Sequence, residues 1–197
     1  MTCIVGLFDK KENCVYMGAD SCGSNGYSKT IRIDRKVFKL KDTNEAILGY
    51  TSSFRMGQLL MYANGLIDEL SIQKDKINHE YLVSKFIPNI IKLFKDGYYS
   101  RNKEGSETGG TFLFAYKDKL YKIENDFQVG MPSEDYIACG CGEDFALGSL
   151  YSTKDSQLST VERIHKSLQS ASNYSVGVCA PYYIINTKNN EVVEFKD

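Results

Sequence analysis

The second and third residues of the chain, Thr2 and Cys3, carry side chains that can act as nucleophiles. A threonine hydroxyl is a weak nucleophile and must pass its proton to a base. When threonine is the first residue of a chain, its own α-amine, with an ordinary pKa of about 8, can serve as that base. The segment CIVGLF that follows predicts a buried strand. The start of the chain is therefore either a strand at a sheet edge or the place where chemistry occurs. For the second case we expect no leader in front of Thr2.

The remaining reactive residues do not suggest a metal site. The six cysteines form no CxxC pair, and the two histidines lie far from them in sequence. We expect most of the cysteines to be small buried apolar residues, and we expect no cofactor. The net charge of −1 gives no basic surface for nucleic acid, and no apolar stretch approaches the roughly 20 residues that span a bilayer. The start also lacks the basic region of a signal peptide, so we expect a cytoplasmic protein that binds neither nucleic acid nor membrane.

Strands and helices alternate in groups along a chain whose length of 197 residues favours one domain, 1–197. Two strand pairs are followed by two helices, three strands, two more helices and a last strand pair. This order predicts an α+β fold in which two stacked antiparallel sheets each carry a helical layer outside. The strands are expected at 3–8, 14–20, 36–40, 45–50, 111–116, 119–124, 135–140, 176–187 and 191–196. The helices are expected at 53–70, 79–99, 143–151 and 159–172. Pro88 is expected to kink the second helix, and Ser159 and Glu162 to form a capping box at the start of the fourth. A polar loop is expected at 100–110.

Five short motifs follow one another along the chain, and they are informative because of their order. They are TCIVG at the start, GAD after the second strand, RKVFKL, LGYTSSFRMGQLL and IACGCGEDFALGSL. Together they resemble the proteasome β-subunit and HslV family of N-terminal nucleophile hydrolases, and the resemblance spans most of the chain. It implies a four-layer αββα sandwich and a threonine-type endopeptidase.

The resemblance also implies roles for individual residues. Thr2 corresponds to the nucleophile once Met1 is removed, and removal is expected because the second residue is small. Lys36 corresponds to the active-site lysine, whose charge would stabilise a developing alkoxide, and Asp20 would hold that lysine charged and oriented. Cys141 stands where the family has a serine near the terminal amine. The backbone of Ser52 would donate to the oxyanion, and Thr51 and Ser24 would flank an extended peptide substrate.

The likeness extends to partners. It implies unfolded protein or peptide substrates, a homo-oligomeric ring and, if the chain behaves like HslV, an ATP-dependent unfoldase.

The chain also departs from the family pattern. Cysteine hydrogen-bonds more weakly than serine, so Cys141 changes how the terminal amine is held. An aspartate and a serine are expected late in the second helix pair, where the alignment gives Gln169 and Ser172 instead. The bulky Phe54 follows Ser52 and Ser53 and would reshape the specificity pocket.

Two alternative functions stay open. Loss of both Met1 and Thr2 would make Cys3 an N-terminal nucleophile of an amidohydrolase. The substitutions at Cys141 and Gln169, together with a retained Met1, would instead suit a structural ring subunit without activity. Each residue also has a simple structural interpretation: Asp20 as a turn residue, Lys36 as a solvated lysine and Cys141 as a buried thiol.

Overall fold

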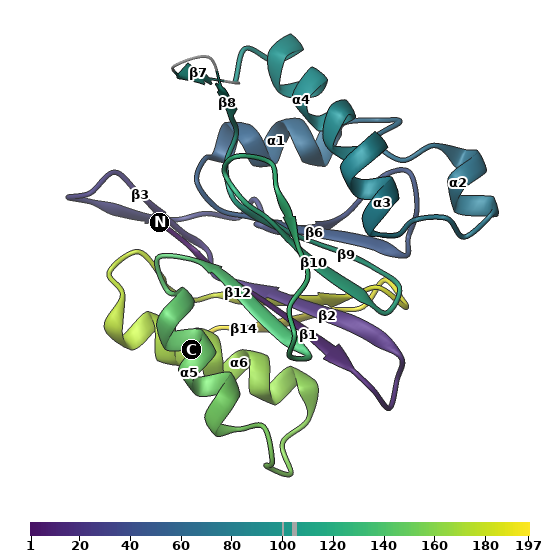
Figure 1. Ribbon diagram of the computed structural model, residues 1–197. Helices are drawn as coiled ribbons and strands as arrows, with labels where there is room; N and C mark the ends of the chain where they lie inside the picture. The colour runs from purple at the N-terminus through teal and green to yellow at the C-terminus, as the bar shows by residue number, and fades with distance from the viewer. Residues whose placement is uncertain (100, 104–105) are drawn as a thin grey trace.

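Two five-stranded antiparallel sheets form the centre of the molecule (Figure 1). The computed structural model describes residues 1–99, 101–103 and 106–197. The first sheet has the order β12-β1-β2-β13-β14, made of Tyr136–Gly140, Cys3–Asp9, Cys14–Ala19, Tyr182–Asn186 and Val192–Phe195. The second has the order β11-β10-β9-β6-β5, made of Val129–Gly130, Lys119–Ile123, Phe112–Tyr116, Ala46–Tyr50 and Val37–Lys39. The expected strand pairs are confirmed, and the strand expected over 176–187 begins later than expected, as β13 after Pro181.

Side chains of successive residues in β1 point to opposite faces of the first sheet and are buried on both. Cys3, Val5 and Leu7 belong to an apolar cluster with two helices that follow β12 in the chain, whereas Ile4 belongs to a cluster between the two sheets. Burial on both faces explains why the strand is a continuous apolar run rather than an alternating one. The first sheet is thus covered by the second sheet on one face and by helices on the other.

Helices cover the outer face of each sheet (Figure 1). On the first sheet lie α5, Glu143–Ser152, and α6, Thr160–Tyr174, and the capping box between Ser159 and Glu162 is confirmed. On the second sheet lie α1, Phe54–Tyr62, and α4, Ile87–Asp96, which share an apolar cluster with strands β6 and β9. No helix among the described residues is long and apolar enough to cross a membrane.

The single helix expected over 53–70 is wrong. α1 ends at Tyr62, and a separate short helix, α2, covers Glu69–Gln73. Between them Gly65 has a positive φ of 72°, a conformation that interrupts a right-handed helix. The expectation rested in part on Leu66 and Leu70, but Leu66 lies in this connection, where it is buried, and Leu70 lies in α2, where it is exposed.

The helix expected over 79–99 is present but not uniform. It runs as α3, His79–Tyr81, a π-helical turn η1, Leu82–Phe86, and then α4. Pro88 lies in the first turn of α4, where a missing N–H is tolerated, so the irregularity falls just before the proline rather than as a kink at it.

Two short hairpins were not anticipated. β3, Cys22–Ser24, pairs with β4, Lys29–Ile31, and this hairpin projects from the body next to the N-terminus (Figure 1). β7, Arg101–Lys103, pairs with β8, Ser106–Thr108, within the segment expected to be a loop. Residues 100, 104 and 105 of that segment lie outside the described residues.

Candidate active site

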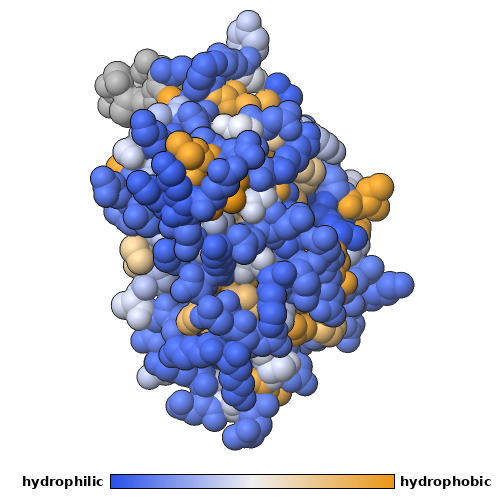
Figure 2. All heavy atoms as spheres, turned by 90° about the vertical axis from the view of Figure 1, so that its right-hand side faces the viewer, coloured by the Kyte–Doolittle hydropathy of each residue, from blue (hydrophilic) through white to orange (hydrophobic). Residues whose placement is uncertain are grey.

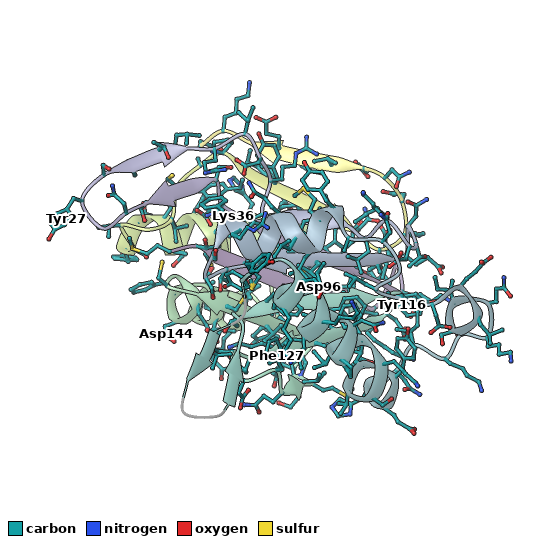
Figure 3. The ribbon with its side chains drawn as sticks, turned by 90° about the horizontal axis from the view of Figure 1, so that it is seen from above. Tyr27, Lys36, Asp96, Tyr116, Phe127 and Asp144 are labelled. Carbon is teal, nitrogen blue, oxygen red and sulfur yellow. The ribbon has the colours of Figure 1, made fainter. Side chains whose placement is uncertain are left out.

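The sequence-predicted site residues come from the ends of strands that belong to both sheets. Thr2 directly precedes β1, which lies between β2 and β12 in the first sheet. Because Ile4 is opposite Ala19, the register places Asp20 beside Cys3, and because Cys3 is opposite Gly140, it places Cys141 beside Thr2. The second sheet contributes Lys36, just before β5. Figure 3 shows Lys36 in the interior of the molecule, close to α1.

Lys36 links the nucleophile to the carboxylate. Its Nζ lies 2.9 Å from Thr2 Oγ1, 3.0 Å from both carboxylate oxygens of Asp20 and 2.7 Å from the carbonyl oxygen of Cys22. The side chains of Lys36 and Asp20 are 1% and 0% exposed. An ammonium group has three hydrogens and no acceptor, and here each hydrogen has a partner. As an ammonium group, Lys36 can therefore stabilise negative charge at Thr2 Oγ1.

Asp20 is held by the backbone as well as by Lys36. Its two oxygens accept hydrogen bonds from the amides of Cys3, at 2.9 Å, and Cys22, at 2.8 Å. Burial raises the pKa of the Asp20 carboxyl above its ordinary value, while the charge of Lys36 and the two amides act in the opposite direction. The carboxylate fixes Lys36 and both neighbouring strands at once, which is more than a turn residue would do.

The turn between β12 and α5 holds the other side of Thr2. The backbone nitrogen of Thr2 donates to Cys141 Sγ at 3.3 Å, and its carbonyl accepts from the amide of Gly142 at 3.4 Å. Gly140 has a φ of 103°, and a Cβ there would lie 2.2 Å from the carbonyl oxygen of Thr2 and 3.2 Å from the methyl group of Thr51. Only glycine fits between these two residues. Cys141 is exposed rather than a buried thiol.

Ser175 is a residue that the alignment missed. Its Oγ donates to Cys141 Sγ at 3.2 Å, whereas Ser172 donates to the carbonyl of Val178. The placement of Gln169 and Ser172 at the family's aspartate and serine positions stays a prediction.

Thr51 and Ser52 form the bend between β6 and α1. Ser52 has a φ of 62°, and no hydrogen bond from its backbone N–H occurs among the described residues. Its Oγ lies 3.1 Å from Thr51 Oγ1 and accepts from the amide of Thr111 at 3.2 Å. The bend therefore holds an unpaired N–H next to the Gly140 contact, as an oxyanion donor requires.

Ser24 lies at the end of β3, in a pocket of about 220 Å³ that also contains Arg32 and Phe54. Its Oγ is buried and has no hydrogen-bond partner among the described residues. Arg32 lies over the Phe54 ring at 3.8 Å, and Lys36 Nζ lies 5.8 Å from the same ring. The pocket is thus next to the Lys36 end of the site, and Phe54 forms the wall between them.

Cys3 is poorly placed to be a nucleophile. Its side chain is fully buried in the apolar cluster with α5 and α6, and its amide is bound by Asp20. Burial, and then the charge of Asp20, raise the pKa of its thiol well above the ordinary value. Among the described residues no group of three or more histidine, cysteine or acidic side chains could hold a metal ion.

Solved structures with the same fold were found by comparison of the coordinates. By sequence, the chain matches no family model and no curated protein. BPH of Thiobacillus denitrificans, a bacterial proteasome homologue solved in complex with epoxomicin, superposes with a TM-score of 0.68 at 16% identity, over 94% of this chain and 97% of that chain. A second structure of BPH gives 0.66 at 15% identity with the same coverage. Eukaryotic HslV from Trypanosoma brucei gives 0.64 at 13% identity, over 94% of this chain and 98% of that chain. The chain therefore has the fold of HslV and of the proteasome homologue BPH, in agreement with the resemblance of its sequence motifs.

Proposed function

We propose that this protein is a threonine-type endopeptidase with the four-layer sandwich of the HslV and proteasome fold, built as one domain. The observation that carries the proposal is the buried chain from Asp20 through Lys36 to Thr2 Oγ1, with contacts of 3.0 and 2.9 Å. Burying a charged lysine to this degree lowers the stability of the fold unless its charge interacts with a negative group. A hydroxyl next to a fixed positive charge is suited to become an alkoxide.

The reaction needs a free amine at Thr2, so the peptide bond after Met1 must first be cut. The α-amine then takes the proton of Oγ1, and Oγ1 attacks the carbonyl carbon of the substrate. The N–H of Ser52 donates to the resulting oxyanion, while Lys36 stabilises the charge on Oγ1. Because Lys36 acts here as an ammonium group, which has no lone pair to accept a proton, we assign the role of base to the α-amine of Thr2.

The second half of the step releases the amine product. The carbon–nitrogen bond breaks, its electron pair stays on the leaving nitrogen, and that nitrogen takes the proton from the Thr2 ammonium group. The ester left on Thr2 is then cleaved by water, with the amine acting again as base. Ser24, whose buried hydroxyl is unpaired, and Thr51 would hold the peptide in an extended conformation.

The fold relationship adds a larger context to the proposal. Rings of several copies, unfolded protein or peptide as substrate and an ATP-dependent unfoldase would follow if the chain works as HslV does. The proposal for the chemistry does not depend on them, because every named group belongs to one chain.

The test is cleavage of an unfolded protein by a chain that begins at Thr2. Reduced and carboxymethylated casein is expected to be cut by this form, and not by its Thr2→Ala variant or by the form that keeps Met1. Epoxomicin provides a second probe, because BPH was solved with it, and it is expected to block the cutting. Cutting by Thr2→Ala would contradict the role of Thr2.

A ring subunit without activity is the second candidate. As long as Met1 is attached, the nitrogen of Thr2 is an amide, and the carbonyl oxygen of Met1 accepts a hydrogen bond from Thr2 Oγ1. The substitution of cysteine at position 141 also weakens the hold on the amine. If the chain that begins at Thr2 folds but cuts nothing, this second candidate replaces the first.

A further inference from the structure

Three exposed apolar residues lie around Ser175, which contacts the hydrogen-bond partner of the Thr2 nitrogen, Cys141. Phe145 on α5 and Tyr174 at the end of α6 have ring centroids 5.5 Å apart, and Val176 follows in the next turn. Their exposed fractions are 39%, 73% and 85%. We call these three residues the apolar shelf. Large apolar side chains gathered on a surface mark a binding site more often than single ones do.

The apolar shelf is fixed to the active site by its own turn. Ser175 lies between Tyr174 and Val176, and its Oγ donates to Cys141 Sγ at 3.2 Å. The turn is closed by a hydrogen bond from the amide of Val178 to the carbonyl of Ser175 at 3.1 Å. Because Cys141 Sγ also accepts from the Thr2 nitrogen at 3.3 Å, one sulfur atom joins the shelf to the proposed base.

Met1 shows that an apolar side chain fits beside this nitrogen. A Cβ on Gly177 would lie 2.3 Å from the Cβ of Met1 and 2.8 Å from Cys141 Sγ, so the methionine side chain lies directly against the glycine backbone. Removal of Met1 would leave a space next to the free amine, floored by Gly177 and continuous along the chain with Val176. Any larger residue at 177 would fill it.

The chemistry decides which part of a substrate reaches that space. The leaving nitrogen takes its proton from the Thr2 amine, so it must lie within hydrogen-bond reach of that amine, directly or through one water. The residue that carries the leaving nitrogen is therefore on the Cys141 side of Thr2. The residue that is acylated lies on the other side, toward Lys36, Phe54 and the pocket that contains Ser24.

We propose that the space now held by Met1, together with the apolar shelf, binds the side chain of the substrate residue directly after the cut and selects apolar residues there. This inference rests on the proposed function. Asp144 precedes Phe145 of the apolar shelf and is exposed. Figure 3 shows it on the same side of the molecule as Tyr27, at the tip of the β3–β4 hairpin. The carboxylate of Asp144 would repel acidic residues at this position.

The experiment is to map the cut sites in carboxymethylated casein by mass spectrometry, using the chain that begins at Thr2. The residue after each cut is expected to be Met, Leu or Phe roughly fivefold more often than Asp or Glu, after correction for composition. Val176→Lys is expected to raise the share of acidic residues after the cut, and Val176→Asp to raise the share of basic ones. Residues before the cut should keep their distribution in both variants.

Opposite shifts from two charges at one exposed position cannot arise from misfolding. Tyr151→Asp, at the far end of α5 and 72% exposed, is the matched control and should leave both distributions unchanged. The inference is overturned if casein is cut but the residues after the cut match its composition, or if both Val176 variants shift them alike. If no variant cuts casein, the proposed function itself fails, and this inference fails with it.

Discussion

Lys36 makes hydrogen bonds to three residues inside the protein, and their loss should separate the effect on stability from the effect on chemistry. In Lys36→Met the carboxylate of Asp20 is left buried without its counter-ion, so the free energy of unfolding should fall by about 3–5 kcal/mol. The rate of casein cleavage should fall by about two to three orders of magnitude, because the alkoxide loses its charge partner. Urea unfolding and cleavage assays measure the two effects.

The double variant Lys36→Met/Asp20→Asn is the control. It removes the unpaired charge, so it should recover much of the stability while the rate stays low. If the rate recovers with the stability, Lys36 is a structural residue only, and the proposed mechanism is wrong.

Cys141 and Cys3 differ in exposure, so a thiol reagent can tell them apart. Cys141 is exposed beside the Thr2 nitrogen, whereas Cys3 is fully buried, and burial raises the pKa of its thiol. Iodoacetamide should therefore inhibit the chain that begins at Thr2 and should not inhibit its Cys141→Ser variant. Serine is a better hydrogen-bond acceptor than cysteine, so this variant should keep its activity. Persistent inhibition of Cys141→Ser would favour the Cys3 alternative.

The ionisation of Asp34 makes the free energy of unfolding depend on pH in the acid range. Two hydrogen bonds from Arg32 hold the pKa of the Asp34 carboxyl below its ordinary value of 3.8. A lowered pKa in the folded state means that this contribution is complete above that ordinary value and is lost as the pH falls through the lowered one. Urea unfolding between about pH 2 and 6 should therefore show a shallower acid decline in Asp34→Asn than in the parent. Arg32→Gln should flatten the decline in the same way, and an unchanged slope in both variants would contradict the assignment.

Among the elements, α1 depends on one close contact with the strand before it. A Cβ on Gly57 would lie 2.1 Å from the ring of Tyr50, which is buried under α1. Gly57→Ala must push the helix away from β6, and it should cost about 1–3 kcal/mol of unfolding free energy. Because Thr51 and Ser52 connect β6 to α1, the KM for casein should rise as well.

Gly148→Ala in α5 is the matched control for Gly57→Ala. A Cβ there would meet no atom within 4 Å, so the same change in an open helical position should raise stability by up to about 1 kcal/mol. A stable Gly57→Ala variant would show that α1 can adjust without cost.

The elements also show what a sequence can predict. β1 and β2 were predictable because strands that are buried on both faces have a continuous apolar sequence. The start of α6 was predictable because its capping box is formed by residues close together in the sequence. The end of α1 was not predictable, since Leu66 and Leu70 keep helical spacing in the sequence while the left-handed Gly65 lies between α1 and α2. The β3–β4 hairpin gave no apolar pattern, because the residues of β4 are all exposed.

The site residues also divide into those that the sequence motifs marked and one that only the tertiary structure places. Thr2, Asp20, Lys36 and Cys141 lie together where the motifs predicted, because each is tied to the end of a strand that the sequence marked. Ser175 was missed because its position depends on how far α6 continues and on the turn after it, which only tertiary contacts determine.

For the molecule as a whole, the β3–β4 hairpin is packed on one strand only: β3 is held at Cys22 by Asp20 and Lys36, whereas β4 is exposed. A two-stranded hairpin alone is marginally stable in water. Here Tyr27 at its tip is fully exposed (Figure 3), and Ile31 and Ile33 are 54% and 93% exposed. The face shown in Figure 2 is by contrast mostly hydrophilic, with apolar side chains in small separate groups. The hairpin side is therefore the better place for contact between copies.

If the copies form a ring as proposed, this hairpin should lie in the contact between neighbours. Native mass spectrometry of the chain that begins at Thr2 should show an assembly of several copies, and Ile33→Glu should dissociate it, because burying an unpaired carboxylate costs more than the contact contributes. Val83→Glu, at a half-exposed residue of η1, is the control and should leave the assembly intact. A parent chain that stays monomeric at micromolar concentration would remove the ring from the proposed function. An assembly that survives Ile33→Glu would move the contact elsewhere. In both cases the chemistry at Thr2 stays open to its own test, because its catalytic groups all come from one chain.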